Sequence, residues 1–190
     1  MCGIFAYKGD KYNWGKLKES VDLISYRGPD NSHYDNISND VLFAFHRLAI
    51  MGVTISGDQP MKHPNDESLT LICNGEIYNY KDLAERYNFN LTTGSDCEII
   101  LYLYQKFGIE RTIKDLDGVF MFVLHDASSN QLFASRDPIG VRPGFIGKKE
   151  DELFIASEAK PLVQLCETVL PFPPGTWWCS DRPKTFKSYF

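Results

Sequence analysis

The chain has 190 residues, of which 43 % are hydrophobic and 24 % charged, and its formal net charge is −5. This length fits one domain with a core of useful size, and the composition is ordinary for a globular protein. Because no run of Lys and Arg is present to neutralise phosphates, and no apolar run approaches the ~20 residues that cross a bilayer, we expect neither a nucleic-acid surface nor a membrane segment.

Short apolar or alternating runs predict six strands, separated by helical patterns. The strands are expected over residues 3–7, 42–48, 69–73, 119–126, 131–135 and 153–156. One helix is expected over 14–26, where Arg27-Gly28-Pro29 ends it, and another over 95–107, where Ser95 followed by Glu98 predicts a capping box. The run 119–124 is apolar on both faces and predicts a central, covered strand, whereas the Pro-rich tail from Pro171 predicts irregular structure. These blocks indicate an α+β layered domain with a largely antiparallel sheet.

The N-terminus lacks a basic region ahead of an apolar stretch, so it predicts no signal peptide, and we expect a cytoplasmic protein. The five cysteines form no Cys-x-x-Cys pair, and the four histidines show no ligand spacing. We therefore expect free thiols, no metal and no cofactor.

Cys2 directly follows the initiator methionine. A small side chain at this position permits removal of Met1, which leaves Cys2 with a free α-amino group. The reference pKa of such an amine is about 7.7–8.0, so the group is partly neutral at pH 7 and can accept a proton. An N-terminal nucleophile can thus carry its own general base. Taken alone, an incidental or merely buried Cys2 remains the favoured interpretation.

Six motifs favour a functional role for Cys2 over an incidental one. They are Met1-Cys2-Gly3-Ile4, Tyr26-Arg27-Gly28-Pro29-Asp30, His46-Arg47-Leu48-Ala49-Ile50, Asn74-Gly75-Glu76-Ile77-Tyr78-Asn79, Gly94-Ser95-Asp96-Cys97-Glu98 and the segment 135–143. In order and spacing they resemble the glutaminase domain of class II glutamine amidotransferases, over residues 1–190. The segment 74–79 is similar to the asparagine synthetase branch. The resemblance implies the four-layer αββα fold of N-terminal nucleophile hydrolases, with two antiparallel sheets.

The resemblance also implies roles for individual residues. Cys2 would attack the side-chain amide of L-glutamine, and the Asn74 amide with the Gly75 backbone N–H would stabilise the oxyanion. Arg47 would bind the substrate α-carboxylate, and Glu76 and Asp96 its α-ammonium. The pocket would be lined in part by backbone groups of Leu48, Ala49, Ile50 and Met51.

Each motif has a plainer interpretation. Asn74-Gly75 alone is a strong signal for a type I′ hairpin turn. Asp96 alone is a suitable first-turn charge for a helix, and Arg47 can pair with any surface carboxylate. As a set, these residues favour the catalytic interpretation. Their neighbours His46 and Cys73 are expected to face away from the site and to be structural, as is the turn at 136–140.

No Ser-Gly-Gly pyrophosphate loop or Walker A motif is present, so the sequence predicts a single glutaminase domain over 1–190 without a synthetase domain. Its ammonia would pass to a synthetase domain or subunit in trans. Two rival functions stay open. One is a catalytically silent domain that binds glutamine for regulation, and the other is an amidotransferase of another branch with a different acceptor.

Overall fold

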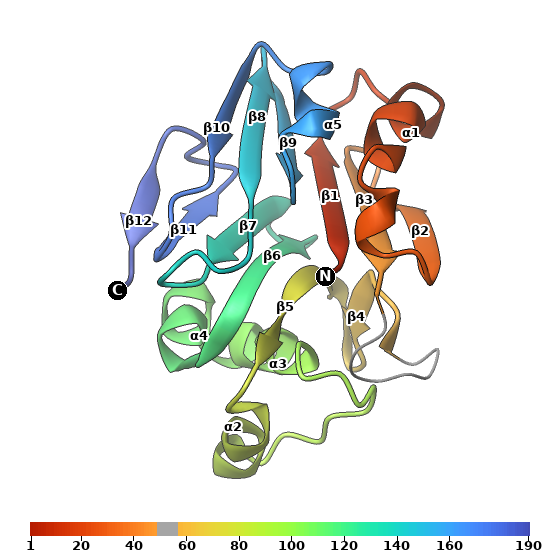
Figure 1. Ribbon diagram of the computed structural model, residues 1–190. Coiled ribbons are helices and arrows are strands. Elements are labelled where there is room, and N and C mark those ends of the chain that lie inside the picture. Colours follow the sequence, from red (N-terminus) through yellow and green to blue (C-terminus); the bar gives the residue numbers. More distant parts are fainter. Residues whose placement is uncertain (49–56) are drawn as a thin grey trace.

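The computed structural model describes residues 1–48 and 57–190, which form two six-stranded sheets (Figure 1). The first sheet has the order β10 (Thr168–Pro171), β8 (Phe145–Lys149), β9 (Glu152–Ala156), β1 (Gly3–Lys8), β3 (Val41–Arg47) and β2 (Asn31–Asn36). The second has the order β12 (Phe186–Ser188), β11 (Thr176–Cys179), β7 (Gln131–Arg136), β6 (Gly118–Asp126), β5 (Asp66–Ile77) and β4 (Met61–His63). Neighbouring strands pair antiparallel throughout both sheets.

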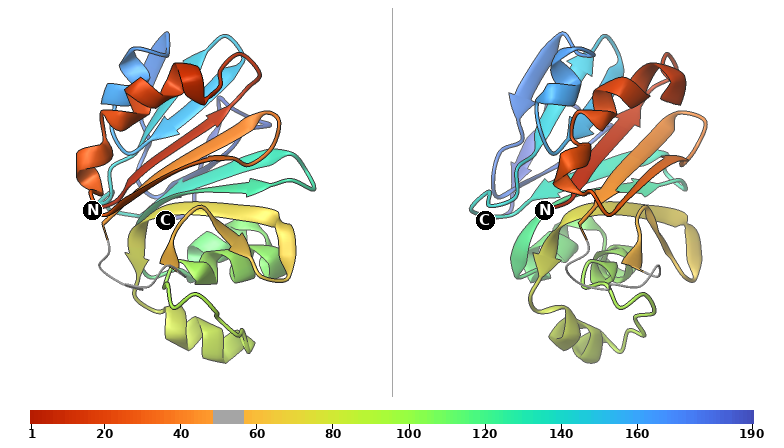
Figure 2. Two further views of the ribbon diagram at one scale, coloured as in Figure 1. Left: turned by 90° about the vertical axis from the view of Figure 1, so that its right-hand side faces the viewer. Right: turned by 45° about the vertical axis from the view of Figure 1, so that its right-hand side comes forward.

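Helices cover the two outer faces of this sheet pair (Figure 2). The first sheet carries α1 (Trp14–Asp22) and α5 (Lys160–Val163), and the second carries α2 (Tyr80–Tyr87), α3 (Glu98–Phe107) and α4 (Ile109–Asp115). A short 3₁₀ helix, η1 (Ser25–Arg27), follows α1. The layer order is therefore αββα, which confirms the predicted fold.

Alternation along the strands divides the core into three layers. On β1, Ile4 and Ala6 point into the space between the sheets, whereas Phe5 and Tyr7 pack with Leu17 of α1. The central strand β6 follows the same rule, because Phe122 faces the helices of the second sheet and its neighbours face the first sheet. The prediction of a central strand covered on both sides is confirmed.

The capping box predicted at Ser95 is wrong. Helix α3 begins at Glu98, and the Glu98 carboxylate accepts hydrogen bonds from the backbone N–H groups of Thr92 and Thr93 at 2.8–2.9 Å. In a capping box, the Glu98 carboxylate would accept a hydrogen bond from the Ser95 N–H. Here it accepts from the preceding loop instead, and the Ser95 N–H donates to the Thr93 hydroxyl at 3.2 Å. Glu98 is fully buried, so it stabilises this loop rather than the first turn of the helix.

Other predicted elements also differ from the structure. The strand expected over 69–73 is longer, because β5 runs over Asp66–Ile77. The first helix ends at Asp22 instead of residue 26, and η1 follows it. The tail after Pro171 is not irregular, because it contains β11 and β12. Its adjacent tryptophans explain this result, since Trp177 packs toward the helices of the second sheet while Trp178 packs between the sheets.

The topology brings the chain start close to two strand segments that carry motifs. Gly3 pairs with His46, so Cys2 lies beside the end of β3. Strand β1 also contacts β5 of the opposite sheet, and the N-terminus lies next to β5 in both figures (Figures 1 and 2). The first, third and fifth strands therefore converge at one edge of the sheet pair.

Candidate active site

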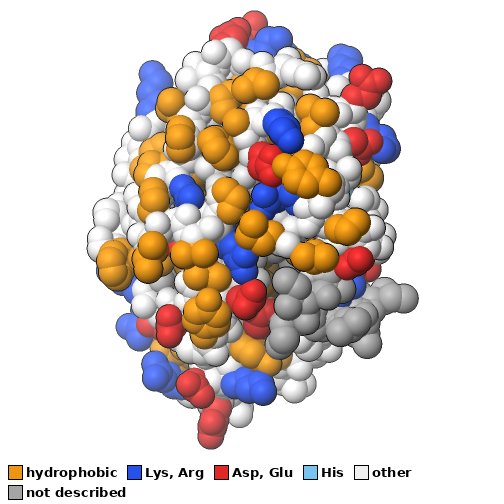
Figure 3. All heavy atoms as spheres, viewed as in Figure 1, with side chains coloured by type: hydrophobic (Ala, Val, Ile, Leu, Met, Phe, Trp, Pro, Cys, Tyr) orange, Lys and Arg blue, Asp and Glu red, His pale blue; other side chains and the backbone are white. Residues whose placement is uncertain are grey.

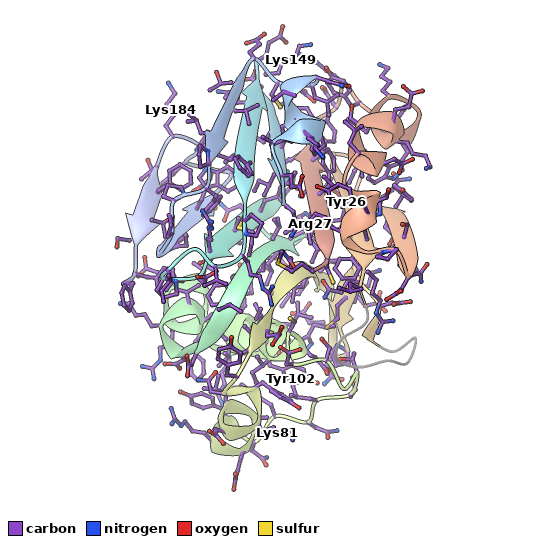
Figure 4. The ribbon with its side chains drawn as sticks, viewed as in Figure 1. Tyr26, Arg27, Lys81, Tyr102, Lys149 and Lys184 are labelled. Atoms are coloured by element: carbon purple, nitrogen blue, oxygen red, sulfur yellow. The ribbon has the colours of Figure 1, made fainter. Side chains whose placement is uncertain are left out.

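At this edge, both the thiol and the backbone carbonyl of Cys2 contact other residues. Its sulfur lies 3.4 Å from the Leu48 backbone nitrogen and 3.6 Å from the Leu48 carbonyl oxygen. Its carbonyl oxygen accepts a hydrogen bond of 3.1 Å from Nε of Arg27, whose guanidinium pairs with Glu158 at 2.8 Å. Figure 4 shows Arg27 reaching from η1 toward the start of β1. These contacts fix the position of the Cys2 thiol relative to the end of β3.

Burial raises the pKa of the Cys2 thiol, while the Leu48 N–H, the chain-terminal ammonium and Arg47 act in the opposite direction. A thiol attacks efficiently only as thiolate, so the groups that lower the pKa are those that activate it. Two of these groups lie together, because Arg47 is the last residue of β3 and Leu48 follows it directly.

Arg47 is the last residue of β3 and is buried. Its guanidinium donates to the carboxylate of Asp58, which is half-buried, and the two form an ion pair. A planar fork held in this way suits the bidentate binding of a carboxylate. Leu48 lies next to Cys2 as expected, whereas the predicted pocket residues Ala49, Ile50 and Met51 lie outside the described residues.

Asn74 and Gly75 do not form a hairpin turn. They lie within the long strand β5, where Asn74 pairs with Met121 and Gly75 with Phe120. Asn74 is 2 % exposed, and its Nδ2 is buried without a hydrogen-bond partner among the described residues. An unpaired buried donor costs about 1–3 kcal/mol, which a fold tolerates where a ligand will use the group.

Gly75 is required by the packing of β5 against β6. A Cβ added there would lie 2.5 Å from the Val119 carbonyl oxygen and 2.7 Å from Cβ of Phe120. Only glycine permits this close approach of two backbones.

Glu76 and Asp96 supply two carboxylates to the same region. The Glu76 carboxylate accepts a hydrogen bond of 2.8 Å from Nη2 of Arg142. Asp96 is 6 % exposed, and its Oδ2 accepts a hydrogen bond of 2.5 Å from the Ile77 N–H. Burial raises the pKa of Asp96, although the Ile77 N–H opposes this shift, and the nearby Glu76 charge adds to it. A cation in the pocket would relieve the repulsion between the two acids.

Most of the motif residues described above line one small cavity. It has a volume of about 50 Å³, and its walls include Met1, Cys2, Arg47, Leu48, Asn74, Gly75, Glu76, Asp96 and Arg142. This is space for roughly one or two water molecules. Because Met1 forms part of the wall, removal of Met1 would both free the Cys2 amine and enlarge the cavity.

Sequence reasoning missed two charged partners of the site, Asp58 and Arg142. Asp58 belongs to no motif and reaches Arg47 only through the fold. Arg142 follows the turn at 136–140, for which the sequence predicts a structural role. The structural role of that turn is confirmed, because the Arg136 guanidinium donates three hydrogen bonds of 2.7 Å to backbone carbonyls. Only the position of Arg142 beside Glu76 reveals that the segment also reaches the site.

The two residues expected to face away from the site, His46 and Cys73, differ in their relation to the cavity. His46 is fully buried, and its ring lies 2.8 Å from the Ser32 hydroxyl and 3.3 Å from the Val21 carbonyl oxygen. Cys73 is buried in the core beneath α3, where Cys97 also lies. His46 is therefore structural, as predicted. Cys73 belongs to the core but also forms part of the cavity wall, so it is not confined to the side away from the site.

Other cavities are larger but gather no comparable set of groups. One of about 610 Å³ is lined by amide and hydroxyl side chains near His63 and Lys106, and one of about 520 Å³ lies against β8 and β10. Within residues 1–48 and 57–190, no three His, Cys, Asp or Glu side chains are grouped to hold a metal ion. The same part of the chain contains no helix long and apolar enough to cross a bilayer.

The sequence is similar to a described family and to curated proteins. A family model described as "Glutamine amidotransferase domain" matches residues 1–172. The chain is 43 % identical over 175 residues to the glutamine-hydrolysing asparagine synthetase of Mesocricetus auratus, a match that covers 90 % of this chain and 31 % of that protein. The identity and both coverages are the same for the Homo sapiens protein. The chain thus spans less than a third of the length of these relatives.

Solved structures show the same fold at lower sequence identity. The glutamine phosphoribosylpyrophosphate amidotransferase from B. subtilis superposes with a TM-score of 0.80 at 19 % identity, covering 100 % of this chain and 49 % of that one. A structure described as the allosteric regulatory enzyme of purine biosynthesis gives a TM-score of 0.81 at 18 % identity, with the same coverage. Together, the motifs, the αββα layers and the match to the family model show that the chain belongs to the glutamine amidotransferase domain family.

Proposed function

We propose that this domain hydrolyses L-glutamine to L-glutamate and ammonia through a thioester on Cys2. The observation that carries the proposal is the buried, unpaired Nδ2 of Asn74 in the cavity that Cys2 also lines. An amide donor without a partner, on a residue that lines the same cavity as a thiol, is a suitable group to stabilise a developing oxyanion. The family membership and the asparagine synthetase relatives support glutamine as the substrate.

The proposed reaction begins after Met1 is removed. The α-amine of Cys2 accepts the thiol proton, directly or through one water, and the thiolate attacks the side-chain amide carbon. Asn74 Nδ2 and the Gly75 N–H stabilise the oxyanion. The Cys2 ammonium then gives its proton to the amide nitrogen as the C–N bond breaks, so that ammonia leaves and the thioester remains. Water then attacks the thioester carbonyl, which releases glutamate and restores the thiol.

Substrate recognition follows from the charges around the cavity. Arg47 binds the α-carboxylate, and Glu76 and Asp96 bind the α-ammonium, so that the site recognises a free amino acid at both charges. Leu48 presents backbone groups beside Cys2. We extend this lining role to Ala49, Ile50 and Met51 on the family resemblance alone.

The ammonia would serve a synthetase domain or subunit, as the names of the relatives suggest. On the face shown in Figure 3, Lys and Arg side chains are scattered among acidic and apolar ones, a distribution that favours protein or small-molecule partners over nucleic acid. We also propose a cytoplasmic location, because a catalytic thiol must stay reduced.

The test is ammonia release from glutamine by the purified chain, measured beside Cys2→Ala with intact masses recorded. Turnover by a chain that lacks Met1, abolished in Cys2→Ala, would support the proposal. If a chain shown to lack Met1 binds glutamine without releasing ammonia, the proposal fails, and a silent glutamine-binding domain takes its place. Retention of Met1 with full turnover would exclude the N-terminal amine as the base.

A further inference from the structure

Arg142 occupies a position in the site that its motif does not explain. Its Nη2 donates to Glu76 Oε1 at 2.8 Å, and its side chain is 12 % exposed, against 39 % for Glu76. Its Nε is buried and has no partner among the described residues. Both residues line the cavity that contains Cys2. The guanidinium is therefore part of the cavity wall rather than a surface group that meets Glu76 by chance.

The backbone of Arg142 is fixed from two sides. The buried Asp137 carboxylate accepts hydrogen bonds from the N–H groups of Gly140, Val141 and Arg142, at 2.6, 2.9 and 3.0 Å. Arg136 Nε donates to the Arg142 carbonyl oxygen at 2.7 Å. The fold thus places the guanidinium, and the guanidinium in turn restrains the more exposed Glu76 carboxylate.

The charge of Glu76 determines whether Arg142 favours or opposes a bound ammonium. A substrate ammonium and the Arg142 guanidinium are both positive, and Glu76 is bonded to the guanidinium. A carboxylate can accept from two partners at once, so Glu76 can bind Arg142 and a substrate ammonium together. If Glu76 lost its charge, the guanidinium would face the ammonium without compensation and would repel it.

We propose that Arg142 is a positioning residue that holds Glu76 toward the substrate α-ammonium and makes the site select amides that carry one. This inference rests on the proposed function for the identity of the substrate. It predicts that the effect of Arg142 on glutamine binding changes sign with the charge of Glu76. Arg142 favours binding when Glu76 is charged and opposes binding when Glu76 is neutral. A residue that merely supports the fold would be harmful to lose in both backgrounds.

The test is a cycle of four proteins: wild type, Arg142→Met, Glu76→Gln and the double variant. Each is assayed with L-glutamine and with glutaramate, which has the same amide and carboxylate but no α-ammonium. Arg142→Met is expected to raise KM for glutamine by about tenfold or more, the range for a lost charge-assisted hydrogen bond, with kcat little changed. KM for glutaramate should move little. In the Glu76→Gln background, the same substitution should lower KM for glutamine.

Binding measurements separate this inference from the proposed hydrolysis. The four combinations are repeated in Cys2→Ala, and glutamine binding is followed by calorimetry. If glutamine binding shows this change of sign but the proteins that retain Cys2 release no ammonia, the proposed hydrolysis is contradicted and the role of Arg142 is supported. Turnover with equal losses for both substrates in both backgrounds would overturn the role of Arg142 and leave hydrolysis standing.

Arg182→Met is the matched control, because Arg182 is largely exposed and pairs only weakly with its neighbour Asp181, at 3.6 Å. It should leave both KM values unchanged. If Arg142→Met does not fold, as judged by its thermal transition, Arg142→Lys replaces it. Lysine keeps the charge but loses the planar guanidinium, so KM for glutamine should rise above the wild-type value while KM for glutaramate should not. An unchanged KM in Arg142→Lys, together with wild-type selectivity against glutaramate, would also contradict the proposal.

Discussion

The Cys2 sulfur accepts a hydrogen bond from the backbone N–H of Leu48, at 3.4 Å, across 46 positions of sequence. This contact joins the start of β1 to the residue that follows β3, and it lowers the pKa of a thiol that burial raises. The pKa of the Cys2 thiol therefore depends on a backbone group, which only a substitution by proline removes.

Leu48→Pro is expected to make Cys2 less reactive, because proline has no N–H to donate and the thiol pKa should rise. The alkylation rate of Cys2 by iodoacetamide at neutral pH should fall by about tenfold, the range for a lost hydrogen bond to a charged group. The rate is measured by mass spectrometry of the N-terminal peptide. Leu48→Ala retains the N–H and serves as the control, and equal rates in both variants would contradict the assignment.

Asn74→Ala is expected to lower kcat by about 10²–10³ with little change in KM, because the lost donor acts on the oxyanion and not on bound substrate. Ammonia release under saturating glutamine measures this effect. Asn65→Ala, at an exposed turn, is the control and should retain full activity. A loss seen mainly in KM would instead place Asn74 among the groups that bind the substrate.

Asp96 should set an acid limit for glutamine binding. Burial raises its pKa, so the carboxylate is protonated at a higher pH than an ordinary aspartate as the pH falls. Binding of the substrate ammonium needs the ionised form, and KM for glutamine should therefore rise on mild acidification. In Asp96→Asn, KM should be high and nearly independent of pH over the same range. The exposed control Asp151→Asn should reproduce the wild-type profile.

Gly75→Ala should destabilise the domain, because the new Cβ would lie 2.5 Å from a backbone oxygen of the paired strand. Overpacking of this kind costs about 1–3 kcal/mol, which urea unfolding can measure. Gly15→Ala is the control. There the nearest atom is the Asn13 side-chain oxygen, at 3.1 Å, and alanine favours the helix. Wild-type stability of Gly75→Ala would show that β5 and β6 can separate at this point.

Strands with an apolar pattern could be predicted from sequence, and others could not. The core strands β1, β3, β6 and β7 alternate or are apolar throughout, and their predicted bounds are correct to within about a residue. Strand β2 lies at a sheet edge with the sequence Asn-Ser-His-Tyr-Asp-Asn and is largely exposed. Such a strand forms because β3 offers it a backbone partner, a cause that no local pattern records.

Some residues of the candidate site could likewise be predicted from the sequence, and others could not. Cys2, Arg47 and Asn74 could be named from their motifs, because the resemblance supplied their roles. Asp58 and Arg142 could not, since each enters the site as the ionic partner of a motif residue across a fold contact. Pairing of this kind depends on which loops the sheets bring together, and sequence spacing does not encode it.

Cys2 extends from the first sheet and Asn74 belongs to the second, so their separation is set by the side chains interleaved between the two sheets. Trimming one of these side chains, such as Ile72 or Phe43, would let the layers settle closer together by a fraction of an ångström. A reacting geometry tolerates little more than this. The distance between Cys2 and Asn74 is therefore sensitive to the spacing of the layers, and substitutions that reduce turnover should also arise among core side chains that do not line the cavity.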